Sequence, residues 1–192
     1  LNLSGSRVYD STRTASGSDL SFTNIVSGET LGLTGSGVLD SPAAGSRTIV
    51  NTNTLAISDG SGIATNYTLT NGTLTMTIVP RSTTVSGTKT YDGTTNVASS
   101  NLTSFSNLAG SDTLSLSGTG TISSADVGTG KIVNTSGLTI DNSSGVGSNY
   151  TLSAATVNVT ERVIGLSGVR AFDGTNNASS TDLSISNVVS GE

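Results

Sequence analysis

The sequence predicts an all-β protein made of tandem small modules, each a β-sandwich of immunoglobulin-like or β-grasp-like type, arranged as an elongated rod. Two observations predict this fold class. Short runs such as residues 74–78 and 156–160 alternate apolar with polar side chains, which is the pattern of a strand with one buried face. Longer blocks of sequence recur in a fixed order, which is the pattern of a repeat protein.

The repeat has a period of about 82 residues. Residues 3–10 return as residues 85–92 and again as residues 166–173. Because further landmarks follow in the same order, low complexity does not explain the similarity. The predicted divisions are repeat 1 at 1–80, repeat 2 at 81–162 and the start of repeat 3 at 163–192, with a circular shift of the module frame left open.

Each repeat is expected to contain roughly seven short strands. Clusters of Gly, Asn, Asp and Ser separate the runs at intervals of about 8 to 12 residues, the spacing of strands in a sandwich or barrel. A helical turn within 101–108 would suit the β-grasp-like alternative. A β-solenoid is less favoured, because its coils would show a period of about 20 to 30 residues. In repeat 2 the runs centre on Val85, 102–105, 114–116, 132–133, 138–140, 150–152 and 157–159.

Composition argues against several function classes. The net charge of -5 would repel a phosphate backbone, so no nucleic-acid partner is expected. No apolar stretch approaches the roughly 20 residues of a membrane helix, so no membrane insertion is expected. The sequence contains no His and no Cys, so the usual general base and thiolate are missing and we do not expect an enzyme.

An aromatic residue followed by aspartate marks the same position in each repeat. We predict that the ring fills the core and that the Asp forms a tight turn, which a following Gly favours because it tolerates positive φ. The alternative is a surface row of aromatic rings that stack on sugars. Burial of Tyr67 and Tyr150 would favour a spacer over an adhesive module. The motif residues are Tyr9 and Asp10, then Tyr91, Asp92 and Gly93, then Phe172, Asp173 and Gly174.

No cofactor is expected, and calcium is the one metal considered. Calcium takes about six to eight oxygen ligands, but no dense calcium-loop motif occurs. The weak candidates are Asp92, Asp112, Asp126 and Asp141, with Asp10, Asp173 and Glu29 as further oxygen donors. Sequons of the N-x-S/T type are interpreted as polar strand surface, with glycosylation as the alternative. They start at Asn2, Asn66, Asn71, Asn101, Asn134, Asn142, Asn149, Asn158 and Asn177.

Four motifs follow one another in repeat 2. They are KTYDGTT at 89–95, AGSD at 109–112, VGTGK at 127–131 and SNYTL at 148–152. Together they resemble the YDG-type repeat domain, and the resemblance extends over the whole chain. Repeat 1 departs from the pattern at Ser11, where the Gly is missing, and repeat 3 has Phe172 in place of Tyr.

The resemblance implies a module of large, filamentous-haemagglutinin-like bacterial adhesins that are exported by two-partner secretion in many tandem copies. It implies a secreted protein at the cell surface or in the extracellular matrix. The expected function is a stalk that acts as an extended spacer in cell adhesion or biofilm. The alternative is that the modules bind carbohydrate or self-associate into a fibre. Expected partners are neighbouring repeats of the same chain, other copies in a fibre, or host and cell-surface glycans.

Overall fold

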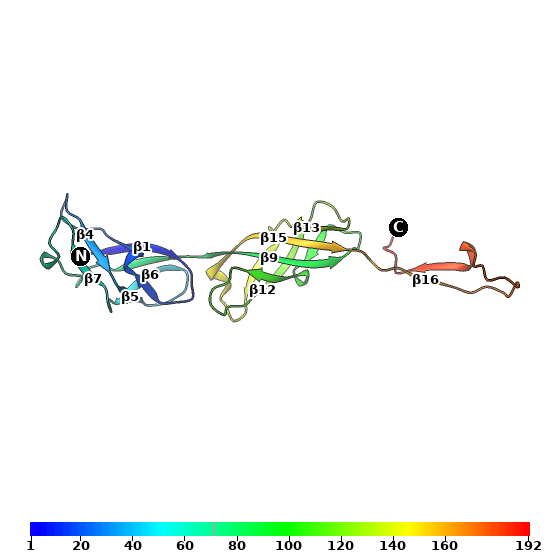
Figure 1. Ribbon diagram of the computed structural model, residues 1–192, viewed down its shortest axis with the longest axis horizontal. Helices are drawn as coiled ribbons and strands as arrows, with labels where there is room; N and C mark the ends of the chain where they lie inside the picture. The colour runs from blue at the N-terminus through cyan, green and yellow to red at the C-terminus, as the bar shows by residue number, and fades with distance from the viewer. Residues whose placement is uncertain (71) are drawn as a thin grey trace. The chain divides into compact units, whose positions relative to one another are not determined.

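The computed structural model describes residues 1–70 and 72–192 (Figure 1). These residues form strands and short 3₁₀ helices, with no α-helix among them, which confirms the all-β class. Within the same residues, no helix is long and apolar enough to cross a membrane. Asn71, where one of the sequons starts, lies outside the described residues.

The elements follow the sequence repeats. Repeat 1 holds β1 (Leu3–Val8), β2 (Thr14–Ser16), β3 (Leu20–Phe22), β4 (Leu31–Thr34), β5 (Ser36–Leu39), β6 (Gly45–Asn51), β7 (Ala56–Asp59) and β8 (Thr75–Val79). Repeat 2 holds β9 (Arg81–Thr90), β10 (Asn96–Ala98), β11 (Leu102–Ser106), β12 (Leu114–Thr121), β13 (Gly128–Ile132), β14 (Leu138–Asn142) and β15 (Tyr150–Thr160). The start of repeat 3 holds β16 (Gly165–Gly168) and β17 (Leu183–Ser186). The 3₁₀ helices are η1 (Gly17–Asp19), η2 (Ala64–Asn66), η3 (Ser99–Asn101), η4 (Gly147–Asn149) and η5 (Ser180–Asp182).

The helical turn considered for 101–108 is mostly strand. The 3₁₀ helix η3 ends at Asn101, the first residue of that segment, and β11 occupies Leu102–Ser106. Leu102 is buried, and the ring of Phe105 is half-buried. Burial of these apolar side chains favours the extended conformation over a helical turn here.

The chain divides into two compact units, each of which draws on two successive repeats. Unit 1 comprises Leu1–Thr84, Phe105–Ser115 and Ile140–Ser153. Unit 2 comprises Val85–Ser104, Leu116–Thr139 and Ala154–Glu192. The repeat boundaries read from the sequence stay predictions, since a unit and a repeat are different divisions of the same chain.

The main sheet of unit 1 has six strands in the order β2-β5-β6-β8-β1-β3. One adjacent pair, β1 and β8, is parallel, with Ser6 opposite Thr77 and Val8 opposite Val79. The other pairs in this sheet are antiparallel. The first and last strands of repeat 1 therefore lie side by side and run the same way.

Repeat 2 uses the same strand neighbours. The order β11-β9-β15-β13 corresponds to β3-β1-β8-β6, so the first and last strands of the repeat are again adjacent. Equivalent backbone hydrogen bonds mark this adjacency: Tyr9 N donates to Val79 O at 2.9 Å, and Tyr91 N donates to Thr160 O at 2.9 Å. The remaining sheets are β10-β12-β14, β16-β17 and β4-β7.

The core of unit 1 forms between side chains that alternate along the strands. Met76 and Ile78 of β8 are 1% and 0% exposed, whereas Val79 is 44% exposed, as expected of a strand with one buried face. The same cluster includes Tyr9, Ala109 and Tyr150, of which two come from repeat 2. Repeat 2 thus contributes side chains to the same core as the strands of repeat 1.

Candidate functional site

The aspartate of the motif forms the same turn in all three repeats. Oδ1 of Asp10 accepts hydrogen bonds from the backbone N–H and the hydroxyl of Thr12, both at 2.8 Å. The turn requires a positive φ at the next residue, which is 66° at Ser11 and 74° at Gly93. Ser11 thus takes the left-handed conformation that the glycine of the other repeats adopts more readily. The equivalent pairs are Asp92 with Thr94 and Asp173 with Thr175.

A basic side chain three residues before each aspartate stabilises the turn. In repeat 2, Lys89 is only 4% exposed, and its Nζ lies 2.8 Å from Asp92 Oδ1. The same Nζ donates to Thr94 O at 2.9 Å and to Asn96 O at 2.6 Å. The hydrogen bond from Lys89 is the main reason that the pKa of Asp92 falls to about 2. Arg7 and Arg170 form the equivalent ion pairs with Asp10 and Asp173.

The aromatic ring of the motif has a different environment in each repeat. Tyr9 is 5% exposed and belongs to the core of unit 1, and Tyr91 is half-buried. Phe172 is 95% exposed, so it does not act as the core anchor that the sequence predicts. The hydroxyls of Tyr9 and Tyr91 donate to acidic residues about 100 positions further along the chain, whereas Phe172 has no hydroxyl to donate.

A carboxylate bridge joins two tyrosines in unit 1. The hydroxyls of Tyr9 and Tyr150 donate to the same atom, Asp112 Oδ2, at 3.0 and 2.7 Å. Their rings meet edge to face, with centroids 5.4 Å apart and planes at 76°. The Tyr150 hydroxyl also accepts from Ala109 N at 3.0 Å. Burial comes first among the causes that raise the pKa of Tyr9 and raise that of Tyr150 to about 12, and Asp112 adds to both shifts.

The other repeats contain partial copies of this carboxylate bridge. Glu29 and Glu192 occupy the positions equivalent to Asp112. In unit 1 the hydroxyl of Tyr67, the equivalent of Tyr150, donates to Glu29. In unit 2 the hydroxyl of Tyr91, the equivalent of Tyr9, donates to Glu192. Asp112 thus accepts from two tyrosines, one in its own repeat and one in the repeat before it, whereas Glu29 and Glu192 each accept from one among the described residues.

An arginine clamp accompanies the bridge. In unit 1, Arg81 donates from Nε to Asn107 O at 2.8 Å, from Nη2 to Asn107 Oδ1 at 2.9 Å, and from Nη1 to Tyr9 O at 3.1 Å. Asn107 has φ 58° and donates from Nδ2 to Ser82 O at 2.7 Å. A planar guanidinium suits this forked arrangement of acceptors.

The same clamp recurs in unit 2. Arg162 donates to Asn187 O and Asn187 Oδ1, both at 2.7 Å, and Nη1 lies 3.5 Å from Tyr91 O. Asn187 has φ 63° and donates to Val163 O at 2.6 Å. The clamp is therefore a feature of the repeat and not of one position.

Sequence reasoning missed the arginine clamp. The signal is present, because Arg81 and Arg162 stand at equivalent positions, as do Asn107 and Asn187. These residues attract little attention in a single repeat, since arginine and asparagine are ordinary surface residues. Only their common contacts with the carbonyl of the motif tyrosine reveal the role.

The carboxylates considered for calcium have other partners or lie apart. Asp92 pairs with Lys89, Asp112 accepts from two tyrosines, and Asp126 accepts from Ser124. Asp141, on β14, is half-buried. Within residues 1–70 and 72–192, no three acidic side chains gather closely enough to hold a metal ion.

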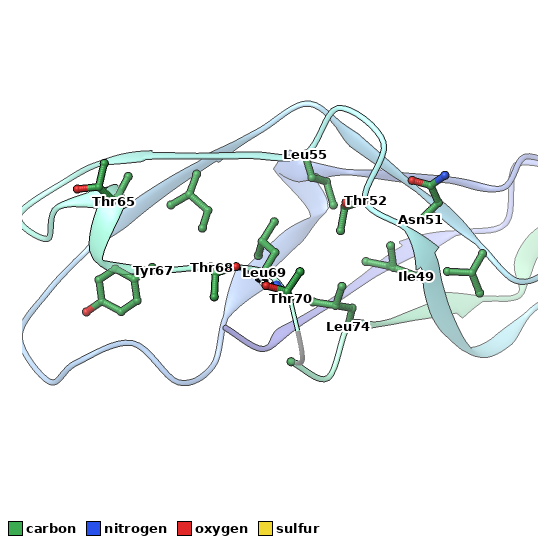
Figure 2. A pocket seen from close by; sticks show the side chains of 14 residues that line it. Ile49, Asn51, Thr52, Leu55, Thr65, Tyr67, Thr68, Leu69, Thr70 and Leu74 are labelled. Carbon is green, nitrogen blue, oxygen red and sulfur yellow. Dashed lines mark hydrogen bonds between the residues drawn. The ribbon is translucent and has the colours of Figure 1, made fainter.

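A second candidate site is an open pocket of about 700 Å³ in unit 1. Figure 2 shows its wall of hydroxyl, amide and apolar side chains, with the ring of Tyr67 at one end. None of the described residues that line it is charged. The labelled lining residues are Ile49, Asn51, Thr52, Leu55, Thr65, Tyr67, Thr68, Leu69, Thr70 and Leu74.

The fold and the repeated contacts define a tandem β-repeat protein whose repeats interlock through side chains. A model of the YDG domain matches residues 2–76 and again residues 73–158. The chain belongs to the YDG domain family. No curated protein and no solved structure matches the chain.

Proposed function

We propose that this chain is a structural stalk segment of a large secreted bacterial surface adhesin, where it acts as an extended spacer in cell adhesion or biofilm. The observation that carries the proposal is the arginine clamp, which forms twice with the same set of acceptors. Each clamp ties the tyrosine carbonyl of one repeat to the asparagine of the next. Identical fixed contacts between successive repeats are what a spacer of regular step requires.

The strand order supports the same role. Because β1 and β8 are adjacent and parallel, the chain enters repeat 1 at one end of the sheet and leaves it at the other. Pro80 alone separates β8 from β9, and proline restricts the backbone at this connection. A short stiff connection after a parallel pair favours repeats in series over repeats that fold back on each other.

The test is small-angle X-ray scattering of the 192-residue chain and of a chain with one more complete repeat. We expect the maximum dimension to rise by one fixed length for each added repeat. The matched control carries Arg81→Met and Arg162→Met, which remove the forked hydrogen bonds and should broaden the distance distribution. A compact particle that barely grows would refute the spacer and favour folded-back or associating repeats.

Carbohydrate binding is the second candidate function, and the pocket of Figure 2 favours it, since it combines hydroxyl and amide groups with a tyrosine ring. Screening the chain on a glycan array tests it. Binding that disappears in Thr65→Trp, a change that narrows the pocket, would support a ligand site. Binding that persists in this variant, or no binding at all, would oppose it.

A further inference from the structure

The first repeat has one half of the carboxylate bridge. Glu29 and Tyr67 stand where Asp112 and Tyr150 stand in repeat 2, and they form the equivalent hydrogen bond. Among the described residues, no second tyrosine donates to Glu29 in the way that Tyr9 donates to Asp112. Tyr67 is half-buried, whereas Tyr150 is 6% exposed.

The asparagine of the clamp has a different conformation in the first repeat. Asn107 and Asn187, each held by an arginine, have φ of 58° and 63°. Asn24 is their equivalent, yet it is outside the left-handed region, and its Oδ1 accepts from Asn2 N at 2.5 Å. Among the described residues no arginine donates to Asn24, whereas Arg81 donates to Asn107 and Arg162 donates to Asn187. The asparagine thus has the left-handed conformation in the two repeats where an arginine binds it.

An apolar side chain close in sequence to Asn24 and Glu29 is also exposed to solvent. Val26 is 60% exposed, while its equivalent Ala109 is 4% exposed beneath Tyr9 and Tyr150. A pocket of about 290 Å³ lies next to it, lined in part by Ile25 and Leu31. Their equivalents in repeat 2 are Leu108 and Leu114, which pack against the core that contains Tyr9.

We propose that the surface formed by Asn24, Val26, Glu29 and Tyr67 is the docking site for another copy of this repeat, placed upstream in the same chain. The upstream copy would supply a motif tyrosine to Glu29 and an arginine to Asn24. The argument rests on continuity with an interface that the molecule already forms, since the same acceptor positions are filled by Tyr9 and Arg81 in repeat 2. It goes beyond the spacer function by naming the residues on each side.

The test is to place an added copy of residues 81–163 directly before Leu1 of the full chain. This join puts Arg162 two positions before Leu1, as Arg81 stands two positions before Thr83. Nuclear magnetic resonance then reports on Asn24, and hydrogen exchange reports on the amide of Val26, which donates to the Tyr67 hydroxyl at 3.3 Å. We expect exchange at Val26 to slow by about tenfold, because the docked copy would cover this amide and stabilise it by about the worth of one hydrogen bond. We also expect Asn24 to move into the left-handed region.

The control is the same added copy with Tyr91→Phe and Arg162→Met, which keeps the join and most of the packing. Strand signals of the added copy that match those of residues 81–162 in the original chain show that both versions fold. Equal exchange at Val26 with the native and the altered copy would overturn the proposal. A second variant, Val26→Asp, should be tolerated in the original chain but should abolish the protection in the fused chain. A fused chain that is long in scattering but shows no protection would refute this docking and leave the spacer intact.

Discussion

At the residue scale, Asp112 accepts two tyrosine hydroxyls through a single oxygen, Oδ2. A carboxylate only accepts hydrogen bonds, so it suits two donors that arrive from different repeats, and its charge strengthens both bonds. The motif aspartates differ from Asp112, because each accepts hydrogen bonds from a turn inside its own repeat. The motif aspartates therefore stabilise local turns, whereas Asp112 joins residues that are far apart in the sequence.

Tyr150 should make the stability of unit 1 depend on alkaline pH. Its pKa is raised from 10.0 to about 12, first by burial, with the neighbouring Asp112 carboxylate adding to the shift. A raised pKa in the folded state means that the contribution is fully present below pH 10.0 and is lost as the pH rises through about 12. Denaturant unfolding across this range measures the loss. Ultraviolet titration in which every tyrosine ionises near 10.0 would contradict this prediction.

Lys89 should control the titration of Asp92. The pKa of Asp92 is about 2, so the stabilisation it gives is present above 3.8 and is lost as the pH falls through about 2. Replacement of Lys89 by Met should return the carboxyl pKa toward 3.8, as measured by carbon-13 magnetic resonance. Lys131→Met is the control, because Lys131 pairs with Ser124 O and not with Asp92. An unchanged pKa in Lys89→Met would show that Thr94 alone stabilises the carboxylate.

At the element scale, the first strand of each repeat approaches a 3₁₀ turn so closely that a side chain does not fit. A Cβ added to Gly5 of β1 would lie 1.9 Å from Asp19 O. The same holds for Gly87 against Asn101 O and for Gly168 against Asp182 O, at 1.7 and 2.0 Å. The repeated Ser-Gly of the sequence is therefore a packing requirement between a strand and the turn that crosses it.

Gly5→Ala should destabilise unit 1 by about 1 to 3 kcal/mol, because the backbone of η1 must move to admit the methyl group. Ser4→Ala, at the exposed neighbouring position, is the control and should change the free energy of unfolding by less than about 0.5 kcal/mol. Chemical denaturation of both variants measures the difference. Equal stabilities would mean that the turn is free to shift.

At the scale of the whole molecule, each compact unit is completed by residues from the repeat that follows. Tyr9, Ala109 and Tyr150 share one core, although they come from two repeats. In a repeat protein, stability is roughly the sum of the repeats and their interfaces. The arginine clamp and the carboxylate bridge are the side-chain contacts that contribute to the stability of the interface between repeats.

Arg81→Lys should reduce the stability of unit 1 nearly as much as Arg81→Met. A lysine keeps the charge but does not reproduce the forked donors that reach Asn107 and Tyr9. The expected loss is about 1 to 3 kcal/mol for either variant, measured by denaturant unfolding. Full stability in Arg81→Lys would indicate that charge and not geometry matters.

The sequence by itself determined the all-β class, the repeat and the family. These depend on the alternation of apolar and polar residues, on the order of motifs and on turn residues such as Asp92 and Gly93. All of these signals can be recognised within short segments of sequence. The tertiary structure alone decided which distant residues meet. Tyr9 and Asp112 are 103 positions apart, and no local pattern pairs them. Phe172 shows the same limit, since it stands at the motif position of Tyr9, yet its ring is 95% exposed and that of Tyr9 is 5% exposed. Burial is a property of the assembled fold and not of the local motif.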